Sequence, residues 1–186
     1  MAQSSWQRPF YFAPYARGAE HADAISRAAA EAVRARLDIV GLAMRDQTGG
    51  VLVDAVVVPL KLDESELRYL KDWPGVGSAG DGFSGSEVEG APAASLEPGE
   101  VGGVLVRNLS DFSRGSSGYD WSRLAREFPS AKVVVRLSVP SRSSSTDHAV
   151  VRYDAFSPNS PSRTLVCQME RRNGGAWHSD ARCIVW

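Results

Sequence analysis

The fold class is decided by the last third of the chain, DWSRLAREFPSAKVVVRLSVPSRSSSTDHAVVRYDAFSPNSPSRTLVCQMERRNGGAWHSDARCIVW (120–186). Asp120 can cap a helix whose apolar side chains recur at helical spacing, and Pro129 ends that helix. Four apolar runs follow, at 133–139, 149–156, 164–171 and 176–186. Strands separated by polar turns pair with their sequence neighbours, so this stretch predicts one helix followed by a four-stranded antiparallel meander.

The two cysteines, Cys167 and Cys183, are predicted to face each other across the last hairpin. Asn173-Gly174-Gly175 indicates the turn, because Asn and Gly tolerate positive φ. A turn centred near Gly175 places Cys167 opposite Cys183, whereas one centred on Asn173-Gly174 places it opposite Asp180. A three-residue loop or one bulge allows the first register. We therefore expect a cross-strand disulfide, typical of an oxidising compartment, with two buried free thiols as the alternative.

The first two thirds of the chain contribute further elements. Residues 1–17 are aromatic and irregular and predict an extended arm that packs on the domain. The alternative is an exposed arm that binds a partner, with Trp6 and Tyr11 as the candidate contacts. The elements expected next are a helix over 19–37, strands over 37–44 and 51–60, a short helix before Pro74 and a strand at 104–106. Residues 74–103 are rich in Gly, Ala, Ser and Pro and predict a long loop. The loop is acidic, because it contains Asp and Glu but no Lys or Arg.

Together these elements predict a single α+β domain over residues 1–186. We expect an antiparallel β-sheet that includes the C-terminal four-stranded meander, with the helices packed on one face of the sheet. A chain of 186 residues is long enough to bury a core of this kind.

Charge and hydropathy exclude two classes of function. The formal net charge is −1, so the chain lacks the basic field that holds nucleic acid. No apolar run approaches the roughly 18 residues of a transmembrane helix. The first six residues lack the basic and apolar regions of a signal peptide. They are either the native start of a cytoplasmic protein or Met1 added to a mature exported chain.

The C-terminal motifs resemble the closing region of a group of uncharacterised bacterial proteins, many of them exported or lipid-anchored. The motifs that carry the resemblance are Asp120-Trp121 with Phe128-Pro129, Leu137–Pro140, Ala149–Val151, Arg171–Gly175 followed by Trp177, and the earlier Gly41–Thr48. In that group a Trp helix ending in FP or YP leads to a β-meander and a G-x-W hairpin. Ser157–Ser162 replaces the Gly- and Cys-rich turn often found there. No activity is established for the group, so the resemblance implies only location and topology.

The side chains suited to acid–base chemistry do not form a recognisable catalytic motif. His178 and His148 are the weak catalytic candidates, because imidazole titrates near neutral pH. The chain has no Gly-x-Ser-x-Gly, phosphate loop or dinucleotide fingerprint. Scattered histidines and a bridged cysteine pair do not predict a metal site, and no cofactor is expected.

Three arginines on the predicted strands, Arg136, Arg152 and Arg171, are candidates for one basic sheet face. Such a face would bind an acidic partner or the chain's own acidic residues 81–100. The alternative is that they are the solvent-facing residues of a half-buried sheet.

These observations favour a non-catalytic, exported bacterial protein that binds a protein or an envelope component. Its expected location is periplasmic or extracellular, with the cytoplasm as the alternative. Two other functions stay open: a hydrolase with a shallow cleft and a histidine base, and a small-ligand-binding domain. The sequence leaves the partner, the substrate and the oligomeric state undetermined.

Overall fold

The computed structural model describes residues 24–42, 50–60, 62, 64–70, 73, 95–142, 147–158, 160–171 and 175–186. The predicted arm 1–17 and most of the predicted loop, 74–94, lie outside these residues. The helices are 24–31, α2 (Val33–Ile39), α3 (Glu64–Leu70) and α4 (Trp121–Glu127), with single 3-10 turns η2 (Ser110–Phe112) and η3 (Gly115–Ser117). The strands are β1 (Val51–Asp54), β2 (Gly99–Val101), β3 (Val104–Arg107), β4 (Val133–Leu137), β5 (Ser141–Arg142), β6 (His148–Ser157), β7 (Ser160–Arg171) and β8 (Trp177–Val185).

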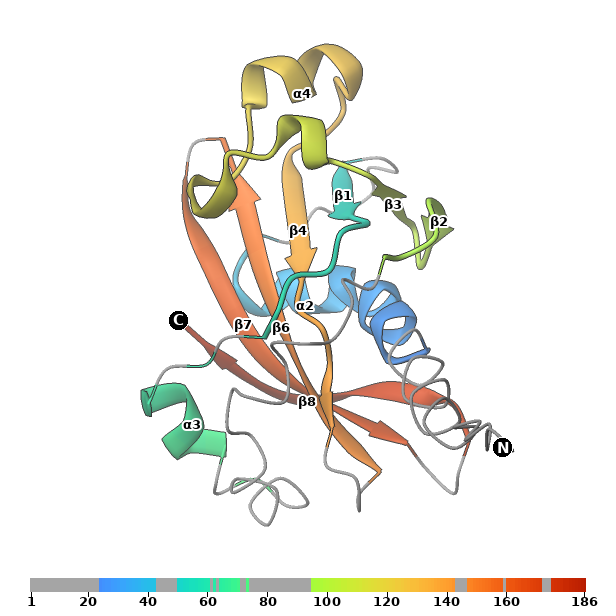
Figure 1. Ribbon diagram of the computed structural model, residues 1–186, viewed down its shortest axis with the longest axis vertical. Helices are drawn as coiled ribbons and strands as arrows, with labels where there is room; N and C mark the ends of the chain where they lie inside the picture. The colour runs from blue at the N-terminus through green and yellow to red at the C-terminus, as the bar shows by residue number, and fades with distance from the viewer. Residues whose placement is uncertain are drawn as a thin grey trace, which may run out of the picture.

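The strands of the described residues form one mixed sheet that curls into a half-barrel (Figure 1). Its order is β2-β3-β1-β4-β6-β7-β8, and β5 pairs with β6. β1 is parallel to both β3 and β4, whereas β4, β6, β7 and β8 pair antiparallel in that order. Because β1 is buried on both faces, all four of its residues have little contact with solvent, as is typical of a parallel strand.

The prediction of an antiparallel meander is therefore wrong for the sheet as a whole. The chain leaves β3, passes through η2, η3 and α4, and returns as β4 on the far side of β1. A crossover through a helix brings the second strand back in the same direction as the first, so β3, β1 and β4 run parallel. The structure confirms the helices and strands of an α+β protein, but not the antiparallel order.

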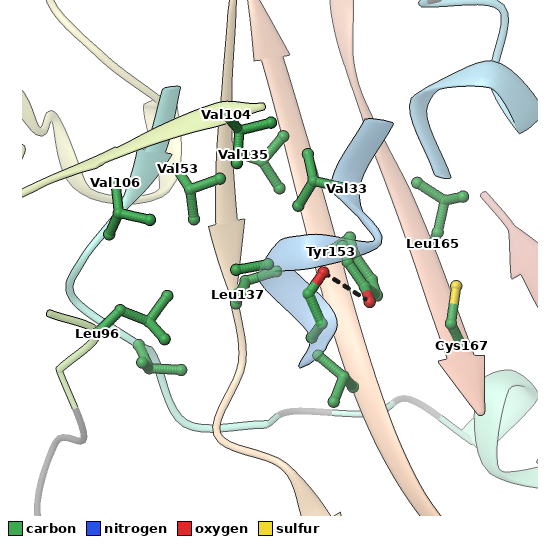
Figure 2. Packing of buried hydrophobic residues seen from close by; sticks show 14 of the residues in the cluster. Val33, Val53, Leu96, Val104, Val106, Val135, Leu137, Tyr153, Leu165 and Cys167 are labelled. Carbon is green, nitrogen blue, oxygen red and sulfur yellow. Dashed lines mark hydrogen bonds between the residues drawn. The ribbon is translucent and has the colours of Figure 1, made fainter. Parts of the chain in front are cut away.

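The larger core lies on the inner, concave face of the sheet, beneath helix 24–31 and α2. Val53, Val106 and Val135 project from neighbouring strands into the same apolar cluster as Val33 of α2 (Figure 2). The hydroxyl of Tyr153 donates a hydrogen bond of 3.3 Å to the carbonyl of Ala29 in helix 24–31. This contact and the apolar packing fix the N-terminal helices against the sheet.

Helices also cover the outer face, contrary to the expectation that all helices pack on one face. Leu124 of α4 packs with Leu52 and Val134 at one end of the sheet. Leu70 of α3 packs with Val150 and Val166 nearer the other end (Figure 1). None of the helices formed by the described residues is both long enough and apolar enough to span a bilayer.

The strand predicted over 37–44 is wrong for its first residues, because α2 continues through Ile39. Val33 and Leu37 lie one helical turn apart and are both buried. Val40 caps the end of the helix, and Gly41 follows with a φ of 70°, which is typical of the residue just after a helix C-cap. Residues 43–49 lie outside the described part of the chain.

Candidate functional site

An open cavity of about 600 Å³ lies at the β2 edge of the sheet, between helix 24–31 and the segment 95–101. Its buried apolar lining comes from Ala30, Val57, Leu96 and Val106. Its exposed lining includes Ala24, Arg27, Glu97 and Glu100. An apolar floor with a few polar groups at the mouth is the usual construction of a ligand site in a protein.

One hydroxyl in the lining of this cavity has no partner. The Ser26 side chain is 1% exposed, and its Oγ makes no hydrogen bond to any described group. A buried hydroxyl without a partner costs free energy, because its hydrogen bonds to water are lost. The Ser26 hydroxyl therefore lies behind the cavity wall, and the polar groups at the surface of the cavity are those of its mouth.

The segment that forms the outer wall of the cavity lies in the stretch predicted as a loop. Ser95 pairs with Val56 in an antiparallel bridge, and Leu96 N–H donates to the carbonyl of Ala55 at 2.8 Å. β2 follows directly and pairs with β3. The sequence does not predict this wall, because three residues between Pro98 and a Gly pair carry too short a pattern to predict a strand.

Arg136 lies on the outer face of β4 and is held by other groups of the chain. Its Nε donates to the Tyr119 hydroxyl at 3.1 Å, and its Nη1 donates to the carbonyl of Gly115 at 3.1 Å. Its Nη2 donates to Ser113 Oγ at 3.2 Å. The guanidinium also lies 4.9 Å from the centre of the Tyr119 ring. These contacts hold the crossover segment before α4 against the sheet.

The Tyr119 hydroxyl connects Arg136 to a buried carboxylate, Asp54. It donates to Asp54 Oδ2 at 2.6 Å, and Asp54 Oδ1 accepts from the backbone N–H groups of Val56 at 3.1 Å and Leu109 at 3.3 Å. Burial, followed by the neighbouring Asp54 charge, raises the pKa of Tyr119 far above its usual value. Tyr119 therefore stays protonated and acts as a fixed donor to Asp54.

Arg152 shares the outer face with Arg136 and also lies among acidic groups. Its Nε donates to Asp154 Oδ1 at 2.9 Å, and its Nη1 lies 3.5 Å from Glu66 Oε1 of α3. Thr164 Oγ1 donates to the same Asp154 oxygen at 2.7 Å. This ion-pair network joins α3 to β6.

The structure places Arg171 on the opposite, inner face. Its Cα pairs in register with Trp177, a residue of the inner core, and its guanidinium lies 5.7 Å from the centre of that indole ring. Both Nε and Nη2 donate to Asp147 Oδ1, at 2.9 and 2.7 Å. The three arginines therefore do not form one face, and each contacts groups of the same chain.

The structure brings the two histidine candidates near one carboxylate. Glu170 on β7 pairs in register with His148 on β6 and with His178 on β8. His148 Nδ1 also lies 2.7 Å from Gln168 Nε2. Among the described residues, no group of three or more His, Cys, Asp or Glu side chains is arranged to hold a metal ion.

Four site candidates remain: the two cysteines, whose pairing is confirmed, and two aromatic residues of the predicted arm, which lie outside the described part of the chain. Cys167 and Cys183 form a disulfide with a Cα–Cα distance of 4.2 Å, as predicted. From the turn, the strands pair in one register from Arg171 with Trp177 to Met169 with Ser179. A register shift in β8 then brings Cys183 opposite Cys167. Trp6 and Tyr11 lie in residues 1–23, which the structure does not describe.

The buried Tyr153 predicts a loss of stability at high pH. Burial raises the pKa of Tyr153 to about 12, and the Arg36 charge opposes that shift. In the unfolded chain a tyrosine ionises near pH 10. From about pH 10 to 12 the unfolded state therefore releases a proton that the folded state keeps. The free energy of unfolding contributed by Tyr153 is complete below pH 10 and falls by about 1.4 kcal/mol per pH unit above it.

Urea denaturation at pH 8 and pH 11 measures this effect. The free energy of unfolding should fall from pH 8 to pH 11 in both proteins. We expect this fall to be smaller by about 1 kcal/mol in Tyr153→Phe than in the unsubstituted chain, because phenylalanine does not titrate. The same loss in both proteins would show that Tyr153 does not couple folding to pH.

Comparison with known proteins gives no relative for this arrangement. No protein-family model matches the chain, and the searches of curated proteins and of solved structures returned no match.

Proposed function

We propose that this chain is a non-catalytic, exported bacterial protein that binds another protein or a component of the cell envelope. The observation that carries the binding role is the open cavity beside β2, with its apolar floor and its charged mouth. A cavity of about 600 Å³ is within the usual size range of ligand sites.

The placement of the histidines supports a non-catalytic role. A general base has to lie within hydrogen-bonding reach of the bound substrate. His148 and His178 lie around Glu170 on β6 and β8, whereas the cavity lies at the β2 edge of the sheet. None of the described residues that line the cavity is a histidine. The hydrolase alternative is therefore not favoured by the geometry.

Export is supported by the disulfide and by the resemblance of the C-terminal motifs to exported proteins. Disulfides persist in the periplasm and outside the cell, and they are rare in the reducing cytoplasm. Cys167 and Cys183 are the chain's two cysteines, and they are bonded to each other.

The mass of the intact protein from its native host tests the export. The protein is alkylated with and without prior reduction. We expect added mass only after reduction, because both sulfur atoms are bonded. Alkylation of both cysteines without reduction would place the chain in a reducing compartment and contradict export.

Site-specific crosslinking in native cells tests the binding role. A photoreactive amino acid replaces Ala24, an exposed residue at the cavity mouth, and separately Ala125, an exposed residue of α4 on the other face of the sheet. We expect light to give one defined adduct from position 24 and none from position 125. Equal adducts, or none from either position, would contradict binding at the cavity.

A further inference from the structure

Among the described residues, no strand pairs with the outer edge of β2. β2 is the terminal strand of the sheet and pairs only with β3 among the described strands. An unpaired strand edge presents N–H and C=O groups that another strand can bind. This edge borders the cavity, because Gly99, Glu100 and Val101 all belong to the cavity lining.

The turn after β2 determines which backbone groups face outward. Gly102 and Gly103 have φ of 56° and 76°, which is the pattern of a two-residue type I′ hairpin. Such a turn places Val101 and Val104 in a hydrogen-bonded pair, and the pairs alternate along the ladder. Glu100 therefore lies in a non-bonded pair, and its N–H and C=O point away from β3. Neither group has a hydrogen-bond partner in the described part of the chain.

The hairpin is held in a fixed position against helix 24–31. A Cβ added to Gly102 would lie 2.7 Å from the carbonyl oxygen of Glu31, so the turn and the helix are in close contact. The free edge of β2 and the helical wall of the cavity are therefore preorganised relative to each other. Preorganisation lowers the entropy lost when a ligand binds.

The cavity can receive side chains of a strand bound at this edge. Gly99 and Val101 lie on the inner-face side of β2, because they pair with Val106 and Val104 of the inner core. Alternate side chains of an added strand would point to the same side. There they would meet the apolar floor of the cavity.

The charged side chains on the edge segment itself are acidic. Glu97 and Glu100 are exposed, and the sequence from Ser95 to Val106 contains no basic residue. Arg27, across the cavity, lies 3.7 Å from Glu31 in a helical ion pair. Lysine or arginine side chains on a bound strand would complement the two glutamates.

From these five observations we infer that the β2 edge and its cavity bind an extended, basic segment of a partner protein by strand addition. The inference rests on the proposed binding function and specifies its ligand. Backbone hydrogen bonds to Glu100 would supply affinity, and small apolar side chains in the cavity would supply specificity.

To test this, the labelled full chain is titrated with a six-residue peptide of alternating lysine and valine whose ends are blocked. NMR of the labelled protein measures the binding. Glu100→Pro removes the outward N–H while keeping the bonds to β3, because proline is tolerated at a sheet edge. Ala24→Trp fills the cavity mouth, and Ala125→Trp is its matched control. We expect each of the first two variants to weaken binding at least tenfold and the control to bind like the unsubstituted chain.

Glu100→Gln separates charge from backbone pairing. It keeps the N–H and removes one charge, so we expect weaker binding that depends less on salt. A matching glutamate–valine peptide is expected to bind at least tenfold more weakly than the lysine–valine peptide. Circular dichroism and thermal melting establish that each variant is folded.

Three results would overturn strand addition: no binding of the lysine–valine peptide, undiminished binding by folded Glu100→Pro, or undiminished binding by folded Ala24→Trp. If the peptide fails while crosslinking from position 24 still gives a defined adduct, strand addition is wrong and the proposed function stands. If both fail, the cavity is not a binding site.

Discussion

Replacing Asp54 by alanine is expected to lower the free energy of unfolding by about 4 kcal/mol. The substitution leaves the Tyr119 hydroxyl and the backbone N–H groups of Val56 and Leu109 without their acceptor. Asp54 and Tyr119 are 3% and 4% exposed, so water replaces these bonds poorly. Each orphaned buried group costs about 1–3 kcal/mol. For a chain of this length the melting temperature should fall by about 10 °C.

Urea denaturation of three further variants checks the cause. Asp111→Ala removes an exposed carboxylate and should change stability by less than about 0.5 kcal/mol. Tyr119→Phe should cost about 2 kcal/mol, because Asp54 Oδ2 then loses its donor. The double variant Asp54→Ala, Tyr119→Phe should be less destabilised than the sum of the single variants, since the two groups interact. Additive losses would show that the hydrogen bond carries no coupling energy.

Replacing both cysteines by alanine is expected to lower the free energy of unfolding by about 3 kcal/mol. Cys167 and Cys183 are 16 residues apart in sequence, and a bridge closing a loop of that length restricts the unfolded chain by about this amount. The bridge also pins β8, the terminal strand of the sheet, to β7. The loss should therefore be accompanied by faster hydrogen exchange in β8 than in β4.

Chemical denaturation with and without a reducing agent provides the control. Reduction should destabilise the unsubstituted chain by an amount close to that of the alanine pair. It should leave the Cys167→Ala, Cys183→Ala protein unchanged, because that protein has no disulfide to reduce. A chain whose stability is the same with and without reductant would contradict the stabilising role of the bridge.

The sequence predicted the features whose signals are local. Asp120 caps α4, its side chain accepting from Arg123 N–H, as its position before the apolar repeat indicated. Phe128 and Pro129 follow the end of that helix. The cysteine pairing was predicted because the hairpin turn and both strands are contiguous in sequence, although the register shift in β8 that completes the pairing is two residues long.

The sheet face on which each arginine lies could not be predicted from such local signals. Alternation along one strand determines which residues share a face within that strand. Which residues of two neighbouring strands share a sheet face depends on the register of their pairing. A shift of one residue in that register moves every side chain of a strand to the opposite face. Arg136 and Arg152 therefore lie on the outer face, whereas Arg171 lies over Trp177 on the inner face.

The cavity and its edge strand were beyond sequence analysis for a related reason. Ser26 and Ala30 come from the N-terminal helix, whereas Leu96 and Glu100 follow a long stretch that reads as loop. β2 becomes a strand because β3 supplies its hydrogen-bond partners and helix 24–31 packs against its turn. The three residues of β2 carry no pattern that predicts contact with either β3 or helix 24–31.

By itself, the sequence determined the capped helix α4, the four C-terminal strands and the disulfide, because caps, turns and side-chain periodicity act between neighbours in the chain. Only the tertiary structure decided that β1 lies parallel between β3 and β4, that helices cover both faces, and that a cavity opens beside β2. These features depend on which distant segments bury one another's apolar surface. Burial is not directional, so local patterns alone do not specify it.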